Sequence, residues 1–349
     1  MKILLIKTSS LGDVVHTFGV LRYLRKRFPD AQIDWVVEKS CKELVEAHPD
    51  LSRAIVIDTK LWRQQLLSPL TWHLVGESLK KLRASTYDSA FDLQGNCKSG
   101  LLLGCIKAKK KVGFGFKSVA EWPNVLFTRK RFNPPLHQNI REDYLFVVQA
   151  FFQDNAPFEE EPVLLKLSCE EEKKAEAFRS ESFQVLVAPG SAWPNKQLSQ
   201  KTLLSLLQTL SEKRKAQLFF SWGSEKERVY ATELASYFPQ NGYVLEKCSL
   251  PLLQNVMARM NLVIAMDSLP LHLCGTTQTP SLSAFGPSSL LKYQPKGEQH
   301  VGVQGVCPYK VSFEKRCPKL RTCPTGFCIK SLPASLLVQA YEDNEKEKC

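Results

Sequence analysis

Short apolar runs and stretches of helically spaced apolar residues alternate along the whole chain. The first apolar run, residues 3–6, is followed by the polar residues 7–10. Apolar positions then return at helical spacing, at Val14, Phe18, Leu21 and Leu24. This pattern predicts a buried strand, a polar loop and a helix, which is the opening unit of a nucleotide-binding type of α/β domain.

The same alternation continues to about residue 285. Further strands are predicted at residues 32–38, 53–58, 87–93, 184–188, 216–222, 243–246, 262–266 and 281–285. Helices are predicted at residues 60–83 (interrupted at Pro69), 140–152, 199–213, 224–238, 250–260, 268–275 and 331–346. The basic, proline-containing residues 129–139 predict a loop. Strands that alternate with helices through short connections predict largely parallel sheets covered on both faces.

An acidic, proline-bearing stretch at residues 154–162 is typical of a domain linker. We therefore expect an α/β protein with two Rossmann-like domains, residues 1–160 and 161–330, that face a central cleft. The final helix, within residues 331–349, has an apolar face and is a candidate to cross back to the first domain.

Composition agrees with a two-domain globular protein. The chain has 349 residues, of which 44% are hydrophobic and 23% are charged. No apolar run is long enough to cross a bilayer or to serve as a secretory signal, so we expect a cytoplasmic protein. The formal charge of +12 indicates an anionic partner: nucleic acid, an anionic lipid surface or a phosphorylated substrate.

Eleven cysteines do not predict a disulfide scaffold in a cytosolic chain of this length. The distinct group near the C-terminus, Cys307, Cys317, Cys323 and Cys328, contains no Cys-x-x-Cys pair. We expect these four residues to be reduced structural thiols rather than a zinc site.

Asp13 is the first candidate catalytic residue, because an acid at the carboxyl end of a first strand faces the ligand crevice of such a sheet. The alternative is structural: Ser10 and Asp13 fit a capping box, in which the carboxylate only satisfies the start of a helix. His16, one turn further on, is likewise either a site residue or a packed histidine.

Polar residues also follow three strands in the second half. Gly190 and Ser191 allow close backbone approach to an anion, and Lys196 adds a positive charge. Trp222 and Gly223 precede Glu225 and Glu227, which suit a ribose diol. Asp267 and Ser268 stand at a helix start. Each has an ordinary surface or capping explanation, but their recurrence at strand ends favours a nucleotide diphosphate site.

These residues resemble the lipopolysaccharide heptosyltransferases of glycosyltransferase family 9. The opening motif is Lys7-Thr-Ser-Ser-Leu-Gly-Asp-Val-Val-His-Thr17. Later matching segments lie at residues 34–38, 92–95, 98–99, 196, 222–223, 267–268, 272 and 285–287. The resemblance therefore covers most of the chain up to about residue 290.

The resemblance implies an inverting GT-B enzyme, without metal or cofactor, that moves heptose from ADP-L-glycero-D-manno-heptose to the Kdo-lipid A inner core. Asp13 falls on the family's proposed general base and Lys196 on its diphosphate-binding lysine. Asp267 falls on the acid near the donor sugar, with Ser268 and His272 on the donor loop. Glu225 or Glu227 would bind the ribose, so the second domain would hold the nucleotide sugar.

The first domain would then hold the acceptor at the cytoplasmic face of the inner membrane, as a peripheral enzyme. The candidate acceptor-binding residues are Thr8, Ser9, Ser10, His16, Lys60, Arg63, Gln94, Lys98, His137 and Arg141. A phosphorylated glycolipid is strongly anionic, so basic residues suit it. The alternative is that these charges form only a solvated positive face.

Leu269 departs from the family pattern, which usually has glycine there, and this puts the donor in doubt. One alternative is a related GT-B transferase with another nucleotide sugar. A second is a catalytically silent protein that binds anionic surfaces. Nucleic acid is not expected, because no aromatic-basic recognition module is present.

Overall fold

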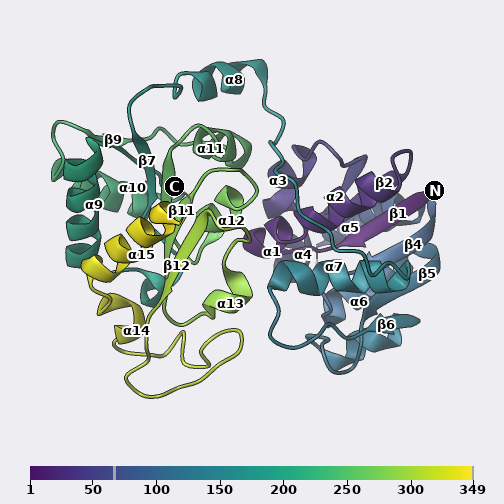
Figure 1. Cartoon of the computed structure of the whole chain (residues 1–349). Helices are drawn as coiled ribbons and strands as arrows, with labels where there is room; N and C mark the ends of the chain where they lie inside the picture. Colours follow the sequence, from purple (N-terminus) through teal and green to yellow (C-terminus); the bar gives the residue numbers. More distant parts are fainter. Residues whose placement is uncertain (66–67, 348–349) are drawn as a thin grey trace. The chain divides into compact units, whose positions relative to one another are not determined.

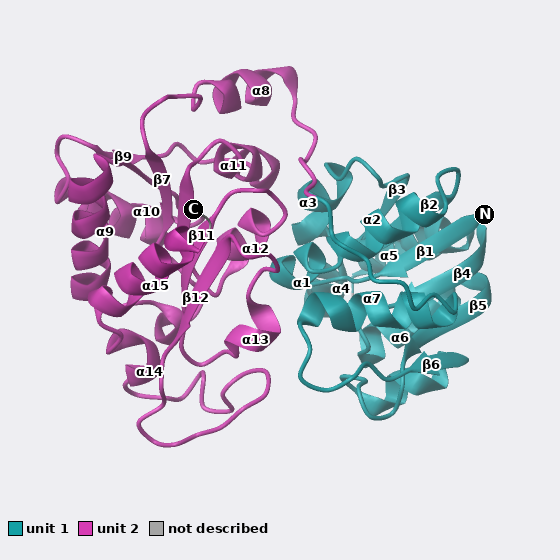
Figure 2. Cartoon of the chain, in the orientation of Figure 1, with its two compact units in different colours: residues 1–161 teal, residues 162–349 magenta. Residues whose placement is uncertain are grey.

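The computed structural model describes residues 1–65 and 68–347. It divides into two compact units, Met1–Glu161 and Pro162–Cys349 (Figure 2). The division falls within the acidic, proline-bearing stretch at residues 154–162. Each unit is an α/β layer structure built on a six-stranded parallel sheet (Figure 1).

The sheet of unit 1 has the order β3-β2-β1-β4-β5-β6. Its strands are β1 (Lys2–Ile6), β2 (Gln32–Glu38), β3 (Arg53–Ile57), β4 (Thr86–Asp92), β5 (Lys107–Phe114) and β6 (Lys130–Phe132). The central strand β1 pairs Ile3 with Ile33 of β2 and with Ser89 of β4. Because β1 is covered on both faces, residues 3–6 are fully buried, as the uninterrupted apolar run predicts.

The helical segments of unit 1 cover both faces of this sheet (Figure 1). They are α1 (Leu11–Val15), α2 (Phe18–Arg27), η1 (Lys39–Cys41), α3 (Lys42–Glu46), α4 (Thr59–Gln64), α5 (Pro69–Arg83), α6 (Cys97–Cys105), η2 (Trp122–Leu126) and α7 (Ile140–Phe151). On one face Leu4 and Ile6 pack with Leu82 of α5 and Leu102 of α6. Part of the predicted segment 60–83, residues 66–67, lies outside the described residues.

The sheet of unit 2 repeats this design in the order β12-β11-β10-β7-β8-β9. Its strands are β7 (Gln184–Ala188), β8 (Gln217–Phe220), β9 (Gly242–Val244), β10 (Leu262–Met266), β11 (Ser281–Phe285) and β12 (His300–Gln304). All neighbouring strands are parallel, for example β10 with β7 and β11. The fold class predicted from the sequence, α/β with two Rossmann-like domains, is confirmed.

Three strands differ from the sequence prediction. Strand β5 lies inside its sheet, but its first half is mostly basic, so no apolar run marks it. The predicted loop at residues 129–139 is wrong at its start, where β6 pairs Val112 with Lys130. Strand β12 was not predicted either. Strands β6 and β12 lie at the edge of a sheet, where partial exposure leaves no apolar run for the sequence to display.

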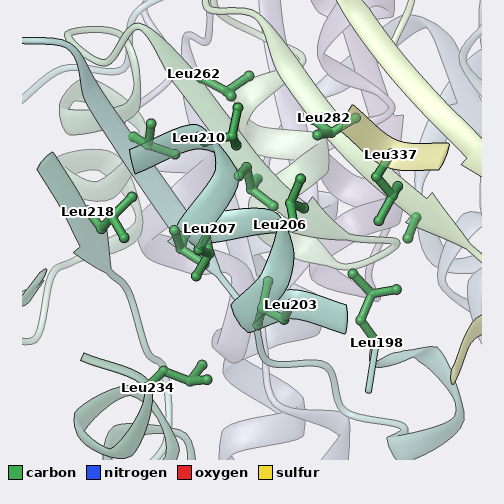
Figure 3. Packing of buried hydrophobic residues seen from close by; sticks show 14 of the residues in the cluster. Leu198, Leu203, Leu206, Leu207, Leu210, Leu218, Leu234, Leu262, Leu282 and Leu337 are labelled. Carbon is green, nitrogen blue, oxygen red and sulfur yellow. The ribbon is translucent and has the colours of Figure 1, made fainter. Parts of the chain in front are cut away.

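The helical segments of unit 2 are α8 (Cys169–Glu176), η3 (Pro194–Lys196), α9 (Gln200–Arg214), α10 (Glu225–Ser236), α11 (Leu250–Met257), α12 (Leu269–Cys274), α13 (Leu290–Tyr293), α14 (Phe327–Lys330) and α15 (Ala334–Lys346). Figure 3 shows Leu203, Leu206, Leu207 and Leu210 of α9 in the core. No described helix has the length and apolar character needed to cross a membrane.

The C-terminal helix α15 belongs to this core. Leu337, Val338 and Tyr341 are buried in it, and Figure 3 shows Leu337 close to Leu282 of β11. The sequence raised the possibility that this helix crosses back to the first domain. In the structure its apolar face is buried within unit 2, beside α9 and β12.

Candidate active site

Asp13 lies in the short helix α1, directly after the polar loop that follows β1. Its Oδ2 atom accepts hydrogen bonds from Ser10 Oγ at 2.8 Å and from Ser10 N at 3.2 Å. Ser10 and Asp13 form the capping box that the sequence predicts. Asp13 is half-buried. The capping interaction therefore fixes the carboxylate at the carboxyl edge of the sheet without burying it completely.

The other carboxylate oxygen of Asp13 faces a residue that sequence analysis did not single out. Tyr144 of α7 donates to Asp13 Oδ1 at 3.4 Å. Lys7 Nζ donates in turn to Tyr144 Oη at 2.8 Å and to Leu93 O at 3.2 Å. Lys7 is only 3% exposed. A buried ammonium thus orients the phenol that contacts Asp13.

The loop before Asp13 is held from the adjacent strand by Gln94. Its Oε1 atom accepts from Thr8 N at 3.1 Å and from Ser9 N at 3.2 Å. Gln94 itself follows β4, where Asp92 accepts from its backbone N at 2.9 Å. Burial raises the pKa of Asp92, whose carboxyl is surrounded by hydrogen-bond donors. The motif at residues 92–95 therefore shapes the loop that carries Asp13.

Lys98 and Glu38 form a second polar cluster in unit 1. Lys98 Nζ lies 2.8 Å from Glu38 Oε1, and Thr59 N donates to Glu38 Oε2 at 3.1 Å. Glu38 ends β2 and Thr59 begins α4. Two segments that carry the family resemblance, residues 34–38 and 98–99, thus meet in one ion pair.

The remaining candidate acceptor residues divide by exposure. Lys60 and Arg63 on α4 are exposed, as is His137, whose φ of 62° is left-handed. His16 is 3% exposed and Arg141 is 5% exposed. Arg141 pairs with Glu160 at 3.1 Å. His16 and Arg141 are thus packed inside unit 1, and their contact with an acceptor stays a prediction.

In unit 2 the structure brings together three residues that follow two different strands, β7 and β10. Lys196 ends η3, Asp267 follows β10 and His272 lies on α12. Lys196 Nζ donates to Asp267 Oδ2, and His272 Nε2 lies 3.3 Å from Asp267 Oδ1. Burial by itself would raise the pKa of Asp267, but the His272 hydrogen bond and the positive charges of His272 and Lys196 hold it well below its ordinary range.

The two candidate ribose acids have different surroundings. Glu227 Oε2 accepts from Gly223 N at 2.9 Å, and a side chain at Gly190 would lie only 2.5 Å from Glu227 Oε1. Glu225 pairs with Arg228 at 2.5 Å and is exposed. Glu227 is therefore the acid that adjoins the loop after β7, where its carboxylate packs close to Gly190.

Three other donor candidates make hydrogen bonds to the backbone or side chains of nearby residues in unit 2. Trp222 Nε1 donates to Leu245 O at 2.7 Å, which fixes the indole after β8. Ser191 O accepts from Gln197 Nε2 at 3.0 Å. Ser268 donates to Met266 O at 3.2 Å instead of capping α12. Leu269 is the first residue of α12 and is half-buried.

Comparison with known proteins finds relatives over most of the chain. The chain is 29% identical over 320 residues to lipopolysaccharide heptosyltransferase 1 of Pseudomonas aeruginosa. This match covers 91% of this chain and 87% of that protein. It is 25% identical to the Escherichia coli protein of the same name, over 82% of this chain and 88% of that protein.

Solved structures share the fold. E. coli heptosyltransferase WaaC with ADP-2-deoxy-2-fluoro heptose superimposes with a TM-score of 0.79 at 22% identity, covering 99% of this chain and 100% of that chain. A glycosyltransferase family 9 protein from Veillonella parvula superimposes with a TM-score of 0.82 at 19% identity. The match covers 99% of this chain and 97% of that chain. The sequence pattern of glycosyltransferase family 9 (heptosyltransferase) matches residues 75–322. This chain therefore belongs to glycosyltransferase family 9, the heptosyltransferases.

Proposed function

We propose that the protein transfers heptose, with inversion, from ADP-L-glycero-D-manno-heptose to the Kdo-lipid A inner core of lipopolysaccharide. Its relatives carry the name lipopolysaccharide heptosyltransferase 1, and WaaC has been solved with a fluorinated ADP-heptose. In this proposal unit 1 binds the acceptor and unit 2 binds the donor.

The Asp13 carboxylate is the observation on which the proposal chiefly depends. Ser10 and Tyr144 hold its two oxygens in place beside a half-exposed loop. An acceptor hydroxyl must lose its proton as its oxygen bonds to the anomeric carbon and the bond to ADP breaks. Asp13 accepts that proton as general base. Lys7 is a positioning residue, because it donates to the Tyr144 hydroxyl that contacts Asp13.

The donor would be bound by the charged cluster of unit 2. Lys196 lies against Asp267, so it is oriented before any ligand arrives, and a diphosphate oxygen can become its additional hydrogen-bond acceptor. That contact would stabilise the negative charge on departing ADP. Glu227 is the better candidate for the ribose diol, since Glu225 is occupied by Arg228.

The acceptor's negative charge suits the exposed cations of unit 1. Lys60 and Arg63 lie on one short helix, and Lys98 is partly exposed. These charges favour contact with phosphate and carboxylate groups at an anionic membrane surface. Peripheral binding to the cytoplasmic face of the inner membrane is therefore part of the proposal.

A product assay tests the proposed function. Purified protein is incubated with ADP-heptose and Kdo-lipid A, and mass spectrometry looks for a product heavier by one heptose. Wild type and the exposed-site control Asp30→Asn should form it. Asp13→Asn should lose at least about a hundredfold in rate, the lower range for general base catalysis, while calorimetry shows unchanged ADP affinity.

Two results would count against this proposal. If wild type forms no product even when the concentration of either substrate is raised, the protein does not catalyse the proposed reaction. Turnover by Asp13→Asn equal to that of Asp30→Asn would remove Asp13 as the base and leave it as a helix cap.

A further inference from the structure

A long irregular segment separates the last strand of unit 2 from its last two helices. It runs from residue 305 to residue 326, between β12 and α14, and contains no helix or strand. Connections longer than about 12–15 residues without structure of their own are uncommon in compact domains. This segment contains Cys307, Cys317 and Cys323, and Cys328 follows it in α14.

All four of these cysteines line one small cavity. Its volume is about 20 Å³, and its other walls include Phe313, Leu320 and Phe327. A cavity needs roughly 10–15 Å³ to hold one water-sized particle. The four cysteines therefore line one space of the size of a single ion, in a largely apolar setting.

Cys323 lies in a tight turn that precedes α14. Its Sγ atom lies 3.8 Å from Thr325 Oγ1. Gly326 adopts a φ of 61°, which favours glycine. The turn therefore fixes the position at which Cys323 joins the cavity wall.

The rest of the segment is anchored to the body of unit 2 by hydrogen bonds. Cys317 N donates to Pro287 O at 2.7 Å, just after β11. Asn195 Nδ2 donates to Leu320 O at 3.0 Å and to Cys323 O at 2.9 Å. Asn195 precedes Lys196, so the cysteine segment also braces the loop that carries the candidate donor lysine.

We propose that Cys307, Cys317, Cys323 and Cys328 bind one thiophilic metal ion, zinc or iron, through their four thiolates. The bound ion would fix the segment of residues 305–326 to the rest of unit 2. Tetrahedral four-cysteine sites are typical of these two metals. All four thiols are free of disulfide bonds in the structure. Spacing along the chain argued against such a site, but folding brings the four residues to one cavity.

Binding requires a local adjustment. Among residues 1–65 and 68–347, no three histidine, cysteine, aspartate or glutamate side chains are so arranged that they could hold a metal ion as they stand. The four sulfur atoms must therefore turn toward the cavity centre as they lose their protons to bind the ion. The site's role is structural, since it holds a segment and takes no part in heptose transfer.

Metal analysis of the purified full-length chain tests the proposal. Wild type prepared without added metal or chelator should retain about one zinc or iron ion per chain. Cys317→Ser and Cys328→Ser should lose it, whereas the control Cys169→Ser, an exposed cysteine on α8, should keep it. The element found distinguishes zinc from iron, and either one supports the site.

A second measurement on wild type does not depend on the variants folding. Apoprotein prepared with a strong chelator is titrated with Co²⁺, whose visible absorption should show tetrahedral thiolate coordination that saturates at one ion. A chain that takes up neither the native metal nor Co²⁺, or that shows disulfides among the four cysteines on thiol titration, overturns the proposal. So does undiminished metal content in both cysteine variants. None of these results depends on transferase activity.

Discussion

Asp267 and Lys196 are charged residues that are each almost completely buried. Their side chains are 5% and 9% exposed, and His272 completes the cluster at 7%. Burying one charge alone is costly, so removing one partner of such a pair destabilises a protein by about 3–5 kcal/mol. The donor site is therefore also a point on which the stability of unit 2 depends.

The stability of Asp267→Asn relative to wild type should depend on pH. The pKa of Asp267 is lowered in the folded state from an ordinary value of 3.8. A lowered pKa contributes stability that is complete above the ordinary value and is lost as pH falls toward the folded-state value. Asp267→Asn should therefore be less stable by about 3–5 kcal/mol at pH 7, and this gap should narrow below about pH 4.

Urea unfolding of both proteins at a series of pH values measures this gap. Asp343→Asn, an exposed change in the same unit, is the matched control and should leave stability within about 0.5 kcal/mol. A gap for Asp267→Asn that stays constant down to pH 3 would contradict the assigned ionisation.

The sequence predicted the elements that carry the candidate site residues where a strand ends in a recognisable motif. Asp13 with its Ser10 cap, and Lys196 with Asp267 and His272, are in the expected elements. It missed Tyr144, because the contact with Lys7 joins positions 137 apart and no local pattern marks it. For the same reason, nothing local to Arg141 reveals that Glu160 neutralises it inside unit 1.

At the scale of elements, most strands followed from apolar runs, including the edge strands β3 and β9, whereas β5, β6 and β12 did not. Strands β6 and β12 are paired on one side only, so their side chains are mixed in polarity. Their existence depends on a neighbour far away in the sequence. The packing partner of α15 could not be predicted either, because an apolar face predicts that a helix is buried but not which element it packs against.

Adjacent leucines on α15 provide a matched test of its packing. Leu337 is 1% exposed and lies in the core of unit 2, whereas Leu336 is 42% exposed. Leu337→Ala should lower the free energy of unfolding by about 2–5 kcal/mol, since it leaves a cavity. Leu336→Ala should change it by no more than about 0.5 kcal/mol. Chemical denaturation followed by circular dichroism measures both, and equal effects would contradict the observed packing.

For the molecule as a whole, the charge of +12 is the dominant electrostatic feature. We predict binding to vesicles that contain anionic lipid and not to neutral vesicles, measured by co-sedimentation. Binding should fall as ionic strength rises, because the screening length shortens from about 10 Å at 0.1 M to about 3 Å at 1 M. Arg63→Glu should weaken binding more than Lys201→Glu, which makes the same change of charge at an exposed residue of α9.

Comparison of these two variants separates a local surface from net charge. Equal loss in both would mean that total charge alone drives binding, and salt-independent sedimentation would exclude an electrostatic surface. The sequence predicted the net charge and two α/β domains. It did not predict how the charge is distributed over the folded surface, because that distribution depends on which faces of the helices and strands are buried.

Placement of α15 in the core of unit 2 also has a consequence for biosynthesis. Residues 1–161 contain every strand of the first sheet, so this unit can acquire its fold while translation is still under way. In unit 2, by contrast, α15 can pack against α9 only after residues 334–346 have emerged from the ribosome. A nascent chain stalled before that point would expose the leucines of α9 and become a client for chaperones.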